Sequence, residues 1–445
     1  MTVAEALAYL HSLQQFGFQP GLASTRRLAA LVGNPHDRLA FIHVAGTNGK
    51  GSVCALLESV YRTSGRRVGL FTSPHLIRFG ERIQINRSLL PESELARLTA
   101  TLRSALEAEN ARTPGDPLTP TFFEFTTVLA LLWFAEQGVD LVIWETGLGG
   151  RWDATNIVTP LASVITNIAL DHQRILGSTT AAIAAEKAGI IKPEVPVLTA
   201  TDDFDARAVI EFRARELAVP CVMIGPSEVA NFRHALGLSG AHQRVNGALA
   251  AATVRLLRAW LPVSDEALAA GLATVQWAGR LQQIQRGSQT FLLDGAHNRA
   301  GIAALQKALP EHFPGTPPTL ILGMLEDKDW AEMAAALVPL CRRVLTAPVA
   351  SPRTVSAEAL RDACRTATVA RPVKAVGSVA EALKQSAPDS RVVITGSLYF
   401  IGEALALLEQ PDESPLNREV DRRLNDWSPG GSGTVPAGSE LPARR

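Results

Sequence analysis

The sequence predicts an α/β fold in two domains, and three observations lead to this expectation. The chain has 445 residues, more than one hydrophobic core usually organises. From residue 40 onward, short apolar runs rich in β-branched residues alternate with segments of helical period, as in a mostly parallel sheet flanked by helices. Near residue 278 a hairpin interrupts this alternation, and a shorter series of strands and helices follows. We therefore expect one domain at 1–278, a smaller one at 279–410, and a mobile tail at 411–445, where Pro, Gly, Ser and charge replace apolar periodicity.

The first domain is expected to contain fully buried strands separated by helices. Its candidate strands are 41–45, 68–72, 141–144, 162–168 and 195–200. After the first of them, apolar residues follow the i, i+3, i+4, i+7, i+8 spacing of a helix face, at Val53, Leu56, Leu57, Val60 and Tyr61.

The second domain is expected to open with a hairpin. Residues 281–286 and 289–294 flank Gly287-Ser288, a dipeptide suited to a tight turn. The further candidate strands are 319–324, 343–347, 373–376 and 391–395.

Charge and composition exclude several classes of protein. Lys+Arg and Asp+Glu are equal at 43 each, so no overall field draws the chain toward nucleic acid or anionic lipid. The four cysteines form no CxxC pair, which favours reduced thiols over disulfides or zinc ligands. The N-terminus lacks a secretory pattern, and no apolar stretch approaches the roughly 20 residues of a membrane span. We expect a cytoplasmic monomer that binds neither nucleic acid nor membrane.

A glycine-rich loop follows the first strand and precedes a helix. Backbone N–H groups in such a loop point at an anion, and the helix N-terminus adds its positive dipole end. The standard phosphate-loop pattern fails at Ala45 and Gly51, where Gly and Ser/Thr would stand. A plain glycine-rich turn is the alternative, but the strand–loop–helix context favours a nucleotide site. Its candidate ATP-binding residues are Asn48, Gly49, Lys50, Gly51 and Ser52.

At this point the chain resembles folylpolyglutamate synthases and dihydrofolate synthases, which belong to the Mur ligase superfamily. The resemblance covers roughly residues 1–410. It rests on motifs in the family's order, namely HVAGTNGKGS at 43–52, TSPHLIRFGERI at 72–83, TFFEF at 121–125, ETGLGGRWDATN at 145–156, DHQRILG at 171–177, EKAGI at 186–190, HQRVN at 242–246, GRLQ at 279–282, DGAHN at 294–298 and TGSLY at 395–399. It implies a P-loop ATPase-type Mur-ligase central domain at the N-terminus, followed by a Rossmann-like C-terminal domain.

Two candidate metal ligands can be named from their position after strands. Glu145 ends one apolar run and His172 follows another, so both should lie at the carboxyl edge of a parallel sheet, beside the phosphate loop. A surface or capping carboxylate, and an ordinary hydrogen-bonded histidine, are the alternatives. The resemblance implies that these two residues bind Mg²⁺ together with Ser73, and a hydroxyl at Ser52 suits the same ion.

Lys187 would be an unremarkable helix lysine without the resemblance. The resemblance implies that CO₂ converts its side chain into a carbamate, an anion that can hold a second Mg²⁺. Carbamylation needs a deprotonated amine, so a depressed pKa would favour it. With Lys50, Glu145 and His172, Lys187 completes the expected catalytic set.

The resemblance also assigns residues near the domain junction to ATP. Asp294 and His297 lie in the DGAHN motif, Asn246 is expected at the base, and Arg280 at the phosphates. An interdomain salt bridge is the alternative role for Arg280. Lys328, in a run of charges, is a weaker candidate for the same cleft.

The pterin-binding residues are implied by the resemblance as well. They are Thr121, Phe122, Phe123, Glu124, Trp152, Asp153 and Ala154. Core packing is the usual role of paired aromatic residues, although a flat pterin also needs a stacking surface. Segment 15–22 is expected to form an outer lip.

Together these expectations describe an ATP-dependent amide ligase that adds L-glutamate to dihydropteroate and to reduced folates through an acyl phosphate. The alternatives are polyglutamylation alone and a catalytically silent nucleotide-binding partner subunit. A ligase of peptidoglycan precursors is disfavoured, because the phosphate loop begins at Gly46 and leaves no room for a preceding UDP-binding domain.

Overall fold

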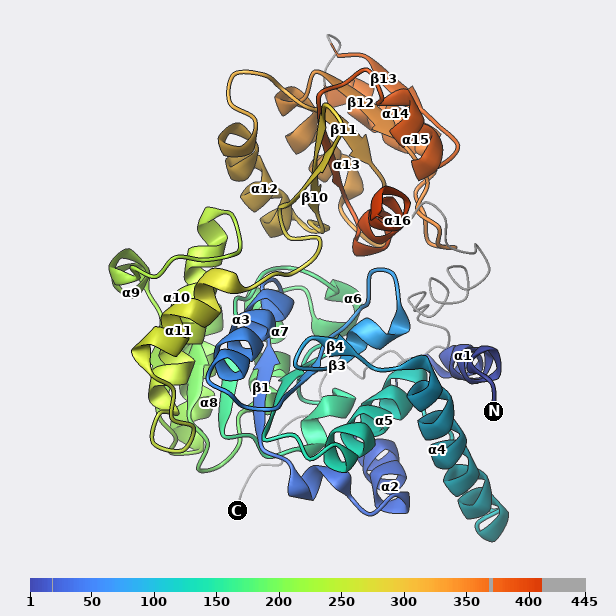
Figure 1. Cartoon of the computed structure of the whole chain (residues 1–445), viewed down its shortest axis with the longest axis vertical. Coiled ribbons are helices and arrows are strands. Elements are labelled where there is room, and N and C mark those ends of the chain that lie inside the picture. The colour runs from blue at the N-terminus through green and yellow to red at the C-terminus, as the bar shows by residue number, and fades with distance from the viewer. Residues whose placement is uncertain (18, 368–370, 410–445) are drawn as a thin grey trace.

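The computed structural model describes residues 1–17, 19–367 and 371–409, and the expected tail at 411–445 lies outside them. It contains two sheets, one above the other in Figure 1, each flanked by helices on both faces. The two-domain α/β architecture predicted from the sequence is confirmed, while the boundary at 278/279 stays a prediction.

The first sheet has eight strands in the order β4-β3-β2-β5-β1-β6-β7-β8. The central strands are parallel, and β3 and β4 extend one edge in antiparallel fashion. The strands are β1 Phe41–Ala45, β2 Val68–Phe71, β3 Ile83–Ile85, β4 Ser88–Leu89, β5 Leu141–Glu145, β6 Ala162–Ile165, β7 Val197–Thr199 and β8 Cys221–Met223.

Helices cover this sheet on both sides. They are α1 Val3–Ser12, α2 Ala23–Leu31, α3 Lys50–Thr63, α4 Glu92–Arg112, α5 Phe122–Glu136, α6 Gln173–Leu176, α7 Thr180–Lys187, α8 Phe204–Glu216, α9 Pro226–Asn231, α10 Ala241–Leu256 and α11 Asp265–Thr274. Short 3₁₀ helices lie at Leu13–Phe16, Pro35–Arg38, Phe79–Arg82, Ala154–Ile157 and Ala188–Ile190.

Successive side chains of β1 and β5 pack in two different hydrophobic cores, one on each face of the sheet. Phe41 and Trp144 pack with α1, α2, α4 and α5, whereas Ile42 and Ile143 pack with α3, α10 and α11. Because both faces are covered, the strands are apolar on both sides, which is why they stood out in the sequence. Helix α3 is buried on all sides from Gly51 to Tyr61, beyond the single face that its periodicity indicates.

The second sheet has the order β13-β12-β11-β14-β10-β9, and all pairs are parallel except the β9–β10 hairpin. The predicted hairpin is confirmed, with Gly287 at φ 58° in its turn. Its elements are β9 Gln282–Arg286, β10 Gln289–Asp294, α12 Arg299–His312, β11 Thr319–Leu322, α13 Trp330–Leu337, the 3₁₀ helix Val338–Leu340, β12 Arg343–Thr346, α14 Ala357–Ala367, β13 Val373–Ala375, α15 Val379–Gln385, β14 Arg391–Thr395 and α16 Leu398–Glu409.

The sequence pattern missed β3, β4 and β8 and made several strands too long. The missed strands have two or three residues each, too few to show a period of two. The expected strand at 162–168 ends at Ile165, because Thr166 and Asn167 leave the sheet to contact the phosphate loop. In the part of the chain that the structure describes, no helix is both long and apolar enough to cross a membrane.

A close helix crossing provides a test of this packing. Gly271 of α11 lies against α3, where an added Cβ would come 2.5 Å from Val60 Cα, and the Ser59 hydroxyl donates to the Gly271 carbonyl at 2.7 Å. We predict that Gly271→Ala lowers the free energy of unfolding by about 1–3 kcal/mol despite alanine's better helix propensity, since backbone must move. Urea unfolding measures this change.

Gly115→Ala is the matched control, because a Cβ there has no neighbour within 4 Å. It should stay within about 0.5 kcal/mol of the parent. Equal stabilities for the two variants would contradict the close crossing.

Candidate active site at the carboxyl edge of the first sheet

The phosphate loop spans Gly46–Gly49, between the end of β1 and the start of α3 at Lys50. Gly46 and Gly49 have φ values of 151° and 86°, which side chains rarely adopt. A Cβ on Gly49 would lie 2.6 Å from the side-chain oxygen of Asn246, so α10 approaches the loop directly. The loop is thus held between the sheet and α10.

The structure explains where the loop departs from the standard phosphate-loop pattern. Gly51 replaces the usual Ser/Thr because the indole of Trp277 packs on it, and a Cβ there would be 2.9 Å from Trp277 Nε1. Ser52 lies one position later and is buried, and its hydroxyl accepts a hydrogen bond from Gln243 Nε2 at 3.2 Å. Ala45 is simply the last buried residue of β1.

Two lysines converge on one backbone oxygen. The Gly46 carbonyl accepts hydrogen bonds from Lys50 Nζ at 3.0 Å and from Lys187 Nζ, at the end of α7, at 2.7 Å. Burial, and then the charge of Lys50, lower the pKa of Lys187 to about 7. A substantial fraction of its amine is therefore neutral near physiological pH.

Glu145, the last residue of β5, lies in the same corner. One of its oxygens accepts a hydrogen bond from the Ser73 N–H at 3.0 Å, which brings the end of β2 beside the end of β5. Burial raises the pKa of Glu145, and the charge of Lys50 and the Ser73 N–H oppose that rise. A buried carboxylate of this kind gains most from a nearby cation.

His172 begins α6 in a left-handed conformation, φ 49°. Partial burial of its ring and the neighbouring charge of Lys328 lower the pKa of His172, so the imidazole is neutral at pH 7.

The expected metal ligands fit Mg²⁺ when nucleotide phosphates complete its shell. Among the described residues no group of three or more His, Cys, Asp and Glu side chains is arranged to hold a metal. Glu145 and the hydroxyls of Ser52 and Ser73 nevertheless provide oxygen donors on the same cavity wall, and Mg²⁺ usually binds through few protein carboxylates and several phosphate or water oxygens.

The second domain contributes the loop after β10. Asp294 is buried and accepts hydrogen bonds from the N–H groups of Leu281 and Ala296 at 3.0 Å each. Burial raises the pKa of Asp294, while Arg280 nearby opposes the shift. Arg280 lies against the backbone of Gly295, and His297 Nδ1 donates to the Gly295 carbonyl at 2.7 Å. Arg280 and Asp294 thus order the junction of the two domains.

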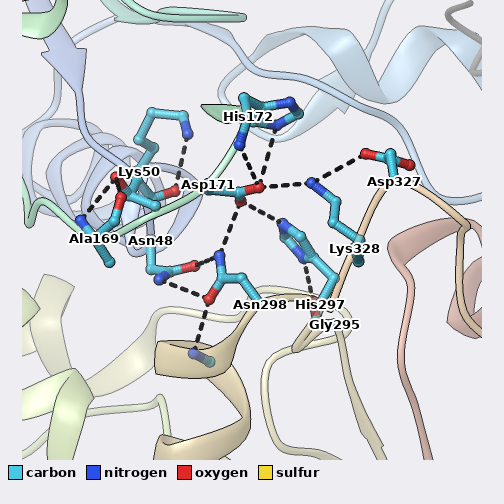
Figure 2. Close-up of polar contacts among 12 residues, drawn as sticks. Asn48, Lys50, Ala169, Asp171, His172, Gly295, His297, Asn298, Asp327 and Lys328 are labelled. Carbon is cyan, nitrogen blue, oxygen red and sulfur yellow. Dashed lines mark hydrogen bonds and ion pairs between the residues drawn. The ribbon is translucent and has the colours of Figure 1, made fainter. Parts of the chain in front are cut away.

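Asp171 and Asn298, for which the sequence predicts no role, join the two domains (Figure 2). The Asp171 carboxylate accepts hydrogen bonds from Asn298 Nδ2 at 2.9 Å and Lys328 Nζ at 2.6 Å, and His297 Nε2 lies 3.6 Å away. Burial alone would raise the pKa of Asp171, but the His297 ring beside it and the nearby charge of Lys328 hold it well below its usual range. Both residues stand in motifs already noted, Asp171 directly before His172 and Asn298 directly after His297.

One cavity of about 1000 Å³ brings together every residue predicted for ATP, metal and catalysis. The residues are Asn48, Gly49, Lys50, Gly51, Ser52, Ser73, Glu145, His172, Lys187, Asn246, Arg280, Asp294 and His297. Both domains line it, since the loop after β10 faces the phosphate loop. Lys328 does not line this cavity but lies beside it, paired with Asp171.

The residues predicted for the pterin are not among the described residues that line this cavity. Thr121 and Glu124 form the capping box of α5, with Glu124 accepting from the Thr121 N–H at 2.7 Å, and also from the Thr25 hydroxyl at 3.2 Å. Phe123 connects the two regions, because its ring leaves no room for a Cβ on Gly147 of the cavity wall.

Around Trp152 the expected pterin residues differ in exposure. The Trp152 side chain is 42% exposed, whereas Asp153 and Ala154 are buried. Asp153 accepts hydrogen bonds from the N–H groups of Leu148 at 2.7 Å and Thr155 at 3.0 Å. Phe122 packs on Phe79 and lies 5.3 Å from the guanidinium of Arg82. Of the expected lip at 15–22, residue 18 is outside the described part.

A phosphate loop that faces a second α/β domain across a shared cavity is the arrangement of a Mur-type ligase, and residues 279–398 match the Mur ligase, glutamate ligase domain. The dihydrofolate synthase/folylpolyglutamate synthase of Bacillus subtilis is 36% identical over 90% of this chain and 97% of its own length. The chain therefore belongs to the dihydrofolate synthase/folylpolyglutamate synthase family.

Solved structures agree over nearly the whole chain. Escherichia coli FolC in complex with DHPP and ADP superposes with a TM-score of 0.80 at 30% identity, covering 93% of this chain and 99% of that one. The Mycobacterium tuberculosis folylpolyglutamate synthase complexed with ADP and AMPPCP gives 0.82 at 28% identity, covering 92% and 99%.

The lowered pKa of Lys187 predicts a pH dependence of stability. An unperturbed lysine titrates near 10.5, whereas Lys187 in the folded protein titrates at about 7. Between these values the unfolded chain binds the additional proton, so this group makes folding more favourable as pH rises. In CO₂-free buffer, the free energy of unfolding of the parent protein should therefore rise relative to that of Lys187→Met between pH 7 and 10. Parallel curves in chemical denaturation would contradict the assignment.

Proposed function

We propose that this protein uses ATP to activate the carboxylate of dihydropteroate or of a reduced folate and joins it to the amino group of L-glutamate. The observation that carries this proposal is the cavity in which the phosphate loop, Glu145, Lys187 and the loop after β10 meet. Family membership and the ADP-bound relatives support the choice of nucleotide and substrate.

In this proposal the phosphate loop and its lysine hold the triphosphate. The N–H groups of the loop and the start of α3 receive the phosphate oxygens, and Lys50 moves from the Gly46 carbonyl to the terminal phosphates. Arg280 also contacts the phosphates, Asn246 contacts the base, and Asp294 and His297 contact the nucleotide from the second domain. The substrate carboxylate attacks the γ-phosphorus, ADP leaves, and an acyl phosphate results.

The second step forms the amide. The glutamate amine attacks the activated carbonyl and inorganic phosphate departs. Residues of both domains surround the reacting groups, so the cavity walls keep water from hydrolysing the acyl phosphate. Ser52, Ser73, Glu145 and His172 would hold Mg²⁺, which would supply positive charge to the transferring phosphoryl group.

Carbamylation of Lys187 is part of the proposal. Its buried amine lies close to Lys50, and a pKa of about 7 leaves part of it nucleophilic toward CO₂. The resulting anion would replace a repulsive pair of cations by an attractive pair and would give a second Mg²⁺ an oxygen ligand.

The pterin is proposed to stack on the aromatic surface of Phe122, Phe123 and Trp152, with Thr121, Glu124, Asp153 and Ala154 around it. Contact between Phe123 and Gly147 supports a continuous path from this surface to the phosphate loop. A cytoplasmic location and a monomeric state stay predictions.

A silent nucleotide-binding subunit is disfavoured because Lys50, Glu145, His172, Lys187 and Asp294 all line one cavity. Polyglutamylation alone is the remaining alternative, and it differs from the dual activity only in where the pterin sits relative to the reacting carboxylate.

A substrate panel tests the function. Purified protein with ATP, Mg²⁺ and L-glutamate should convert dihydropteroate to dihydrofolate and should lengthen tetrahydrofolate by further glutamates, with ADP and phosphate released. Mass spectrometry identifies the products. If only tetrahydrofolate gains glutamate, the enzyme is a polyglutamate synthase alone. If neither does, the folate assignment is wrong.

Lys187→Arg tests the carbamate. Arginine keeps the positive charge but cannot form a carbamate, so we expect turnover to fall below detection while ADP still binds, as measured by calorimetry. Labelling with ¹³CO₂ should give a carbamate carbon resonance in the parent protein that this variant lacks. Near-normal activity of the variant would remove the carbamate from the mechanism.

A further inference from the structure

We propose that Asp171 is a positioning residue for ligation: through Lys328 and Asn298 it holds the second domain against the phosphate loop. The kinetic consequence rests on the proposed function, whereas the structural consequence does not.

Asp171 stands in the first domain, yet its side-chain partners come mainly from the second. Lys328 follows β11, and Asn298 is the N-cap of α12. The side chains of Asp171 and Lys328 are 6% and 9% exposed, and 2.6 Å separates Lys328 Nζ from Asp171 Oδ1. A pair so well shielded from water is screened far less than a surface ion pair.

Asn298 extends this contact to the phosphate loop. Its amide nitrogen donates to Asn48 Oδ1 at 2.9 Å as well as to Asp171, and Asn48 Nδ2 donates back to Asn298 Oδ1 at 3.1 Å (Figure 2). The Asn48 N–H in turn donates to the side chain of Asn167 at 2.8 Å. A single second-domain residue therefore touches both the loop and the segment that follows β6.

Separation of the domains would break all these contacts together. Asp171 would lose Lys328, Asn298 and His297 at once, and the contacts that remain, from the N–H and the ring of His172, come from its own neighbour. The same separation would open the cavity, since the loop after β10 forms one of its walls. Asp171 therefore favours the arrangement in which the residues proposed for catalysis face one another.

Paired substitutions separate positioning from simple packing. Asp171→Asn keeps an oxygen for Asn298 but removes the charge that Lys328 meets, and Lys328→Gln removes the same contact from the other domain. Asp329→Asn is the matched control. It is also a change from Asp to Asn, it lies next to Lys328, and it affects only an exposed ion pair with Arg299. Thermal melts check that each variant folds.

In the ligation assay we expect kcat to fall at least about tenfold for Asp171→Asn and Lys328→Gln, with a smaller change in KM for ATP, because misplacement of reacting groups by about 1 Å can cost about 100-fold. The kcat of the double variant should be no lower than that of the less active single variant, because both substitutions remove the same contact between Asp171 and Lys328. Asp329→Asn should match the parent.

Small-angle X-ray scattering of the ligand-free full chain gives a reading that needs no activity. The radius of gyration should rise for both single variants and stay unchanged for Asp329→Asn. Parent-like kcat and radius in Asp171→Asn, or effects of the two substitutions that multiply, would overturn the proposal. A parent protein without ligase activity would defeat the proposed function, and the scattering result would still decide the role of Asp171.

Discussion

The position of β1 in the middle of a parallel sheet is the constraint on which the rest of the site depends. Parallel neighbours end at the same edge of the sheet. The phosphate loop after β1, Glu145 at the end of β5 and the segment from β6 to Asp171 therefore lie close together. The chain first builds β2 and β5 on one side of β1 and then β6, β7 and β8 on the other. A crevice opens where strand order reverses, and the loop lies in it.

The first-domain fold could be predicted because covered faces make its strands apolar throughout, as in Phe41–Ala45. The phosphate loop and Glu145 could also be found, because the loop follows a strand and Glu145 ends one, whereas Lys187 and Asn246 lie on helices and were named only through the family resemblance. The sequence could not predict contacts between segments that are far apart in the chain and meet only in the folded protein. Trp277 and Gln243 lie far in sequence from Gly51 and Ser52, and nothing local marks them as the neighbours of these two residues. Glu124 shows that a local motif can have two explanations. The TFFE segment suggested a pterin site, but its Thr121 and Glu124 also form the capping box of α5.

The electrostatics of the corner are unfavourable without a ligand. Lys50 and Lys187 share one carbonyl oxygen, Glu145 is buried enough to raise its pKa, and His172 is kept neutral. Under the proposed function, an anionic nucleotide and a divalent cation would relieve these costs, because Lys50 would then meet phosphate and Glu145 would meet the metal. Such preorganisation, at an electrostatic cost in the free protein, is common at functional sites, where charged groups are already in place before a ligand binds.

The second domain contributes few side chains to the cavity, but the cavity is complete only when these side chains face the first domain. Asp294 is fixed by N–H groups on both sides, and one of these belongs to Leu281 at the entrance to the domain. The residues that connect the two sheets and those that line the cavity are therefore adjacent in the chain. Rotation of the second domain would move Arg280, Asp294 and His297 as a unit, because β10 pairs with β14, the Gly295 N–H donates to the Gly279 carbonyl, and the His297 ring donates to the Gly295 carbonyl. In the proposed mechanism the phosphate loop of the first domain would hold the phosphates, whereas a site closed to water would require both domains, since both line the cavity.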